Sequence, residues 1–371
     1  MSDTLLVSTR KGLFEVRRHS SGWSIQQVSF IGENVTLTLV DVRDGTWYAA
    51  TKHDVFGPQL HRSEDDGASW MELPVPSYPD APAGEDAGER AVPSSLRLIW
   101  SLAAGGADHT GELWAGTVPG GLFRSRDRGE SWELIESLWN QPERAKWFGR
   151  GSSYPGIHSV LVDPRDSKRV LVAVSCGGIW ESRDAGESWT LRSSGMRAAY
   201  MPEEQASDPS VQDPHCLVAC AGDFDALWVQ HRSGIWRSRD GGASWDEIGE
   251  AGPSTFGFTV AVHPQQPDTA YFVPAVSDKH RYPEDGRVVV TRTRDGGRSF
   301  DVLRRGLPQD HAYDIVYRHA LDIDQSGERL ALGSTTGNLW VSEDAGDSFI
   351  NVGGHLPPIY AVQFVPTVSP S

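Results

Sequence analysis

Three histidines occupy one equivalent position in three short apolar segments, and they are the residues best suited to chemistry. The segments 158–163, 215–220 and 319–324 align without a gap, and each begins with His. With 12 His in 371 residues, three at equivalent places exceed chance. Imidazoles that face a common axis can bind one divalent transition metal (Zn, Cu, Fe or Mn), hold an anionic substrate or transfer protons.

Other readings of His158, His215 and His319 stay open. Each could simply hydrogen-bond a carbonyl group of the neighbouring unit, and no compact motif such as His-Glu-x-x-His supports a metal. The sequence therefore predicts a metal site, a metal-free catalytic site or a structural role. His231 lies shortly after His215 and is a candidate fourth ligand or supporting partner.

Further candidates lie in loops expected beside these histidines. Their cations favour a ligand that carries carboxylate or phosphate, because the chain as a whole has a net charge of −16. Cys176 lies in one of these loops and reads best as a buried, inert thiol. The predicted substrate-binding residues are Arg10, Lys52, His53, Trp147, Arg150, Arg232, Tyr313 and Tyr360.

A repeated motif indicates which elements position these residues. Ser/Thr-x-Asp-x-Gly-x-Ser-aromatic occurs six times, beginning at Ser63, Ser125, Ser182, Ser238, Thr293 and Ser342. In such a turn the Asp carboxylate accepts backbone N–H groups, and Gly supplies a positive φ. The closing Trp or Phe then buries a large ring against a neighbouring sheet.

The spacing predicts an all-β, seven-bladed β-propeller. Gly12-Leu13-Phe14 and Trp23 keep the spacing of the other copies, so the N-terminus holds a seventh unit without the motif. Seven units of about 53 residues suit four-stranded blades. The N-terminal strands lack an innermost partner, and we expect the C-terminal strand at 359–365 to complete the first blade. Residues 1–371 then form a single domain.

The aligned histidines fall at the start of innermost strands, on one rim of the central channel. The corresponding first residues of the other four inner strands are expected to be Thr36, Ser101, Phe258 and Tyr360. Three connections between blades are long, at 74–95, 136–157 and 192–214. Loops of this length are usually functional lids or disordered insertions. The first has a disorder-prone composition, whereas Trp147 and Arg150 make the second a candidate lid.

Composition limits the partners. The chain has 34 basic against 50 acidic residues and no basic cluster, which disfavours nucleic acid and anionic membranes. We expect a cytoplasmic protein, because the start shows no leader and three cysteines provide no disulfide framework. A small-molecule ligand is the expected partner, and the oligomeric state is left open.

The repeated motif resembles the Asp-box (BNR) repeat of sialidases, some endoglucanases, sortilin-type receptors and a photosystem assembly factor. The chain is most similar to small bacterial sialidase-like proteins of this kind. That resemblance implies a propeller, but only Arg10 matches the arginines with which sialidases grip a carboxylate. The Ile-Pro of their first-blade motif is missing from Ser8-Thr9-Arg10-Lys11-Gly12.

Three functions follow as hypotheses. The preferred one is an intracellular enzyme that acts on a small polar or anionic substrate at the His-lined channel. A carbohydrate-active protein, similar to sialidases or other glycosyl hydrolases, is the second. It lacks an obvious carboxylate pair, since Asp314 and Asp322 come from one blade and Asp213 stands alone. The third is a non-catalytic propeller that binds protein partners.

Overall fold

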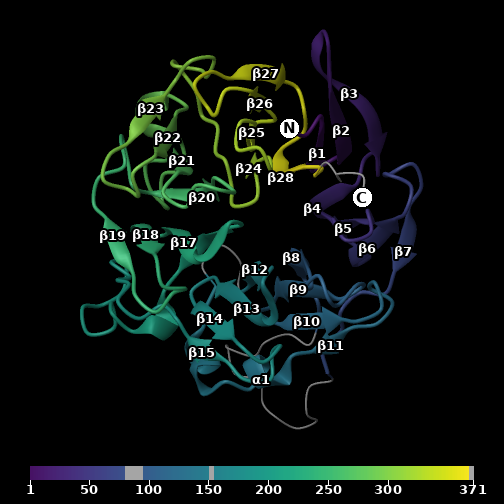
Figure 1. The fold of residues 1–371 in the computed structure, drawn as a ribbon, viewed down its shortest axis with the longest axis vertical. Helices are drawn as coiled ribbons and strands as arrows, with labels where there is room; N and C mark the ends of the chain where they lie inside the picture. The colour runs from purple at the N-terminus through teal and green to yellow at the C-terminus, as the bar shows by residue number, and fades with distance from the viewer. Residues whose placement is uncertain (80–94, 150–153, 367–371) are drawn as a thin grey trace.

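A computed structural model describes residues 1–79, 95–149 and 154–366. It shows the predicted all-β, seven-bladed propeller, in which seven four-stranded sheets surround a central axis (Figure 1). Neighbouring strands of each sheet are antiparallel, and the innermost strands line the channel. No helix among the described residues is long and apolar enough to cross a membrane.

The strands of the first four blades follow one another in chain order, apart from the last strand of the chain. The first blade contains β1 (Thr4–Thr9), β2 (Gly12–His19), β3 (Gly22–Ser29) and β28 (Ile359–Phe364). The second contains β4 (Asn34–Val40), β5 (Trp47–His53), β6 (Gly57–Ser63) and β7 (Met71–Leu73). The third contains β8 (Leu98–Ala104), β9 (Leu113–Val118), β10 (Leu122–Ser125) and β11 (Glu133–Leu134). The fourth contains β12 (Ile157–Asp163), β13 (Asp166–Val174), β14 (Gly178–Ser182) and β15 (Thr190–Leu191).

The remaining three blades repeat this arrangement. The fifth contains β16 (Pro214–Cys220), β17 (Asp223–His231), β18 (Gly234–Ser238) and β19 (Asp246–Ile248). The sixth contains β20 (Gly257–Val262), β21 (Ala270–Pro274), β22 (Val290–Thr293) and β23 (Asp301–Leu303). The seventh contains β24 (Leu321–Ile323), β25 (Leu330–Gly333), β26 (Leu339–Ser342) and β27 (Ile350–Gly353).

The C-terminal strand closes the ring, as predicted. β28 pairs antiparallel with β1, with Val362 opposite Val7 and Phe364 opposite Leu5. It supplies the innermost strand that the N-terminal segment lacks (Figure 1). The apolar side chains of β28 are buried, so the first blade depends on both ends of the described chain.

Repeated aromatic residues fill the space between blades. Trp114, Trp180, Trp228 and Trp340 occur on the second or third strands of four blades, and each is at most 2% exposed. Burial of such large rings between sheets is the main source of the packing energy that holds neighbouring blades together.

The six repeated turns form the predicted hydrogen bonds. In the second blade the Asp65 carboxylate accepts the Ser69 N–H (2.8 Å) and hydroxyl (2.6 Å), and the Gly67 N–H donates to the Ser63 hydroxyl (2.8 Å). Gly67 has a φ of +81°, and Asp66 before it also has a positive φ of 53°. Two consecutive left-handed residues turn the chain sharply and leave the carbonyl of the first one pointing outward.

In four of the six turns, that outward carbonyl joins the turn to the preceding blade. Arg292, which stands just before the turn of the sixth blade, donates to the Ala345 carbonyl in the turn of the seventh (2.7 Å). Arg124 makes the same contact with the Ala185 carbonyl (2.7 Å). The same pattern links Arg62 to Arg128 and Arg237 to Gly296. We call this contact the inter-blade latch.

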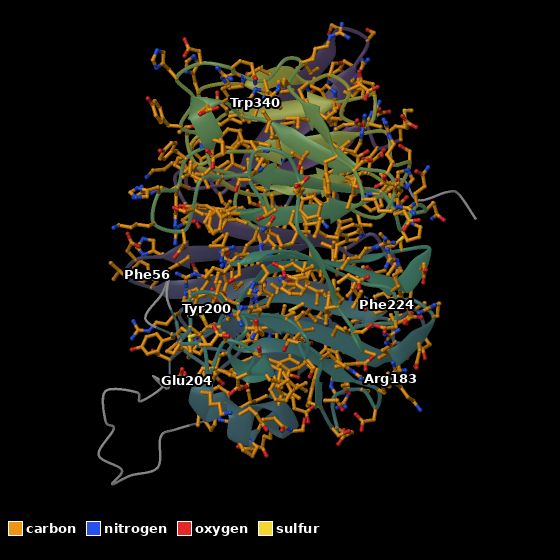
Figure 2. All side chains as sticks on the ribbon, turned by 90° about the vertical axis from the view of Figure 1, so that its left-hand side faces the viewer. Phe56, Arg183, Tyr200, Glu204, Phe224 and Trp340 are labelled. Carbon is orange, nitrogen blue, oxygen red and sulfur yellow. The ribbon has the colours of Figure 1, made fainter. Side chains whose placement is uncertain are left out.

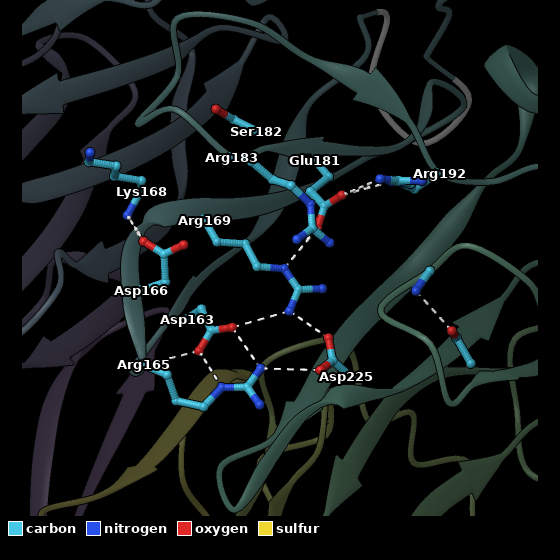
Figure 3. A network of polar contacts seen from close by, with 12 residues as sticks. Asp163, Arg165, Asp166, Lys168, Arg169, Glu181, Ser182, Arg183, Arg192 and Asp225 are labelled. Atoms are coloured by element: carbon cyan, nitrogen blue, oxygen red, sulfur yellow. Dashed lines mark hydrogen bonds and ion pairs between the residues drawn. The ribbon is translucent and has the colours of Figure 1, made fainter.

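The fourth blade has Glu181 in place of the latch arginine, and a buried charge network joins it to the fifth blade. Figure 3 shows Arg169 between Asp163 and Glu181, with Asp225 of the fifth blade also in contact. Arg192 and Arg183 contact the same Glu181. These partners hold the pKa of Glu181 below its ordinary value despite burial.

Replacing a latch arginine is expected to destabilise the ring. Arg292 is 3% exposed and also contacts Asp347 (2.7 Å) and Asp301 (3.0 Å), so Arg292→Ala should cost about 2 kcal/mol. Arg294→Ala is the matched control, because exposed Arg294 contacts the same Asp301 but not the Ala345 carbonyl. Urea unfolding of both variants measures the difference, and equal stabilities would contradict the latch.

Candidate functional site

One residue from each blade occupies an equivalent position near the start of its innermost strand. Six of these strands have a register irregularity at that point. The seventh residue, His319, lies two residues before β24. We call these seven residues the mouth ring. They are Thr36, Trp100, His158, His215, Phe258, His319 and Tyr360.

The mouth ring corrects one sequence prediction. Ser101 was expected at the equivalent position of the third blade, but the bulge between Ile99 and Ser101 places Trp100 there. Ser101 instead donates its hydroxyl hydrogen bond to the Ile157 carbonyl of the next blade (3.1 Å). A one-residue change of register moves the side chain to the other face of a strand, and here it brings an indole into the mouth.

A pocket of about 560 Å³ lies at the channel mouth. Six of the seven ring residues line it, all except His158. Five cationic side chains surround it against two carboxylates, although the chain as a whole is acidic. The cations are Lys52, Arg97, Arg232, Arg281 and Arg318, and the carboxylates are Asp213 and Asp278.

Arg318 is the most unusual of these cations. Its guanidinium lies over the Trp100 ring at 4.7 Å, and its buried Nε has no hydrogen-bond partner among the described residues. Arg232, by contrast, contacts Asp278 and lies 3.7 Å from Asp213. Burial lowers the pKa of Arg318 below its ordinary value, which means that the charge of this group is poorly compensated.

His158 and His215 are buried, His319 is partly buried, and each of the three bonds a backbone carbonyl. His158 Nε2 lies 2.7 Å from the Pro214 carbonyl, and His215 Nδ1 lies 2.8 Å from that of Gly257. His319 Nε2 bonds the His158 carbonyl (2.7 Å), although the innermost strands of their blades, β24 and β12, lie on opposite sides of the channel (Figure 1). Burial lowers the pKa of His215 and His319 to about 4 and holds that of His158 well below its ordinary value, so all three are neutral at pH 7.

These contacts separate the three rings instead of converging them on one point. Within residues 1–79, 95–149 and 154–366, no group of three His, Cys, Asp or Glu side chains is placed to hold a metal ion. The geometry therefore adds no support to the predicted metal site on these histidines. His158 lies below the pocket and lines a second cavity of about 250 Å³ farther along the channel.

His231 lies behind the pocket wall. The Asp213 N–H donates to its Nε2 (2.9 Å), and the Ser233 backbone nitrogen lies 3.0 Å from its Nδ1. Burial lowers its pKa to about 3. His231 therefore orients the backbone of Asp213 and does not face the ligand space, so the partner role suits it better than the ligand role.

The other predicted residues divide between the pocket and its surroundings. Lys52, Arg232 and Tyr360 line the pocket. The remaining described candidates do not: His53 caps its own hairpin, Arg10 is exposed, and Tyr313 is 62% exposed. Arg150 lies outside the described residues.

Trp147, which the sequence placed in a candidate lid, does not line the mouth pocket. Trp147 is 7% exposed and packs edge-on against Trp180, with ring centroids 5.9 Å apart. Its long connection contains the helix α1 (Glu136–Trp139) and the 3-10 turn η1 (Pro142–Lys146), which cover the fourth blade. The connection before β16 contains η2 (Pro209–Val211), and much of 74–95 lies outside the described residues.

The loops around the mouth and the repeated turns lie at opposite ends of the propeller, as expected. Figure 2 shows Phe56, Tyr200 and Glu204 toward one face, and Arg183 and Phe224 toward the other. Arg183 belongs to the repeated turn of the fourth blade, whereas Phe56 belongs to the β5–β6 hairpin beside Lys52. The mouth pocket is therefore free of the structural turns.

Some pocket residues were not predicted from the sequence. Among them, Arg97 and Tyr317 come from irregular segments, which no repeat alignment covers. Arg318 directly precedes the aligned His319, and that adjacency was the available signal. A long arginine side chain next to a histidine that faces the channel can also reach the channel.

Fold and site together define the class: a seven-bladed propeller with a cation-rich pocket at one channel mouth. No family model matches the chain. An oligoxyloglucan-reducing end-specific xyloglucanase from Emericella nidulans is 32% identical over 129 residues, which are 34% of this chain and 13% of that protein. The chain thus spans a small part of the curated relatives it matches.

Solved structures share the fold over nearly the whole chain. The GH74 xyloglucanase from Xanthomonas campestris has a TM-score of 0.65 and 19% identity, covering 95% of this chain and 52% of that one. YCF48 bound to D1 peptide has a TM-score of 0.55 and 14% identity, covering 92% and 89%. These likenesses establish the propeller architecture, since one fold hosts many functions.

Proposed function

We propose that this protein binds, and acts on, a small molecule carrying a carboxylate or phosphate group at the channel mouth. The observation that carries the proposal is Arg318, a partly buried guanidinium that lines the pocket and whose buried Nε has no hydrogen-bond partner among the described residues. A planar guanidinium donates two parallel hydrogen bonds to carboxylate or phosphate, which is the arrangement such an anion favours.

Electrostatics supports an anion more than any neutral ligand. Removing a cation from water is unfavourable unless an opposite charge compensates it, and here no carboxylate contacts Arg318 directly. Asp213 and Asp278 neutralise Arg232 and Arg281, which leaves Lys52, Arg97 and Arg318 without a carboxylate partner among the described residues. An anionic ligand supplies the missing charge.

The walls of the pocket suit an organic ligand. Trp100 lies under the Arg318 guanidinium, and Phe258 packs edge-on against Tyr317 with ring centroids 4.9 Å apart. Tyr360 closes another side. Aromatic walls with a few convergent polar groups are typical of small-molecule sites.

Replacing Arg318 tests the proposal. Arg318→Gln is expected to weaken the binding of phosphate, succinate and malate about 10- to 100-fold, because a charge-assisted hydrogen bond contributes about 1.5–3 kcal/mol. Titration calorimetry and ligand-induced shifts in Tm measure the effect. Without ligand, the variant should melt at the same temperature as the wild type or higher, because an uncompensated buried charge is gone.

The matched control is Arg304→Gln, an exposed arginine that does not line the pocket. It should leave the binding of all three anions unchanged. If none of the anions binds at millimolar concentration, or if Arg318→Gln binds them as the wild type does, the proposal is wrong.

A second candidate is glycoside hydrolysis, which the xyloglucanase relatives favour. Asp213 and Asp278 both line the pocket. Arg232 contacts Asp278 and lies 3.7 Å from Asp213. A glycosidase also needs a protonated acid with a raised pKa. The pKa of Asp213 is lowered by His215 and Arg318, so we prefer the anion-binding function. Release of reducing sugar from xyloglucan oligosaccharides, lost in Asp278→Asn, would favour the hydrolase instead.

A further inference from the structure

We infer that Asp213 and His215 form a hydroxyl-binding subsite, so that the ligand of the mouth pocket is a small hydroxy acid. The inference rests on the proposed anion-binding function and specifies its ligand class. In this arrangement Arg318 binds the carboxylate, and the Asp213–His215 pair accepts a hydrogen bond from a hydroxyl group.

The protonation of His215 follows from its hydrogen bond. Its Nδ1 lies 2.8 Å from the Gly257 carbonyl, and a carbonyl oxygen only accepts. Nδ1 therefore carries the proton in the neutral ring, and Nε2 presents a lone pair. The ring is stacked on Phe258 at 4.8 Å and is 3% exposed, so it is held in this orientation.

Asp213 presents a second acceptor to the same space. Its Oδ1 accepts the Cys176 N–H (3.0 Å) and the Ser175 hydroxyl (3.3 Å). Its Oδ2 lies 3.8 Å from His215 Nε2. Two acceptors that face each other in a buried site, 3% exposed each, require a donor between or beside them.

The position of Arg232 indicates which kind of donor group can bind between Asp213 and His215. Its Nη1 lies 3.7 Å from Asp213 Oδ2, beyond hydrogen-bond range but close enough to share a bridging atom. A hydroxyl group donates to Asp213 or His215 and accepts from Arg232 at the same time. An ammonium group only donates, and the nearby guanidinium groups of Arg232 and Arg318 repel it.

One small molecule can reach both subsites, because Arg318, Asp213 and His215 line the same pocket of about 560 Å³. Arg318 is also close enough to alter the titration of both Asp213 and His215. A hydroxy acid carries the required anion and hydroxyl on adjacent or nearby carbons, which satisfies the buried groups with one ligand.

Matched probes that differ in a single hydroxyl test the inference. We would titrate the full chain with malate and succinate, lactate and propionate, and 3-phenyllactate and 3-phenylpropionate. At least one hydroxylated probe should bind about 10- to 100-fold more tightly than its match, since a site with unpaired buried polar groups rejects the analogue that leaves them unpaired.

Three variants separate the subsites. Asp213→Asn should remove the hydroxyl preference without weakening the binding of the deoxy probes, and His215→Asn keeps the inference testable if the first variant fails to fold. Arg318→Gln should weaken both members of each pair. Equal binding of hydroxylated and deoxy probes by the wild type, with Arg318 still required, would overturn the hydroxyl subsite and leave anion binding intact. Absence of binding by every probe would overturn both.

Discussion

A chain that lacks β28 is expected not to fold. Removal of residues 359–371 takes away four buried side chains, Ile359, Ala361, Val362 and Phe364, and leaves β1 as an open edge. Burial of each large apolar side chain contributes about 1.5–3 kcal/mol, so the loss approaches the whole stability of about 5–15 kcal/mol of a typical domain. Far-UV circular dichroism and size exclusion chromatography would show an unfolded or aggregated chain.

A chain that ends at Pro366 is the matched control, because it retains all of β28 and should melt as the wild type does. Adding a synthetic peptide of residues 357–366 to the shortened chain should restore a cooperative melting transition by pairing with β1. A shortened chain that melts within a few degrees of the wild type would show that the ring does not need β28.

The second large effect is acid sensitivity caused by four histidines that are buried or partly buried. The pKa of His215 and His319 is about 4, that of His231 is about 3, and that of His158 is also strongly lowered. In the unfolded chain their pKa is about 6.5, so the unfolded state binds more protons below that pH. Stability is therefore complete above pH 6.5 and falls as the pH drops toward 4.

The expected loss is about 1.4 kcal/mol per pH unit for each histidine, or about 2 kcal/mol each at pH 5. Asp322 opposes it, because burial raises its pKa to about 7 and the folded state gains a proton where the unfolded state does not. The stability that Asp322 gains at low pH offsets the loss from about one of the four histidines. Urea unfolding at pH 7, 6 and 5 should show a steep decline in the free energy of unfolding.

Substitution of one histidine checks the assignment. His158→Gln removes one titrating group, so its free energy of unfolding should fall less steeply between pH 6.5 and 5, from a lower value at pH 7. His311→Asn is the control, because His311 is exposed and should not affect the slope. A wild-type stability that is flat between pH 7 and 5 would contradict the prediction.

The repeat predicted the architecture well because its physical causes are local. Turn chemistry, the Gly before each third strand and the aromatic spacing each act within a few residues, and together they define a blade. The closing strand was predictable as well. The N-terminal unit lacks an inner strand and the C-terminus has one extra strand, so the extra strand completes the first blade. No local pattern contradicted it.

The site was less predictable because it depends on contacts between blades. Trp100 took the place expected for Ser101 because a bulge changed the register by one residue, and the pairing partner decides where a bulge occurs. Trp147 resembled a lid residue in the sequence, yet Gly177 leaves room for its ring beside Trp180. Arg318 stands in an irregular segment, where no periodicity indicates direction.

The hydrogen bond from His319 to the His158 carbonyl also affects how a ligand can reach the pocket. It joins opposite walls of the channel, and the Arg318 carbonyl beside it accepts the Thr259 hydroxyl (2.8 Å). Arg318 and His319 border both the mouth pocket and the cavity below it, so this segment stands between them. We therefore expect a molecule bound in the pocket to enter and leave through the mouth, on the side away from this segment.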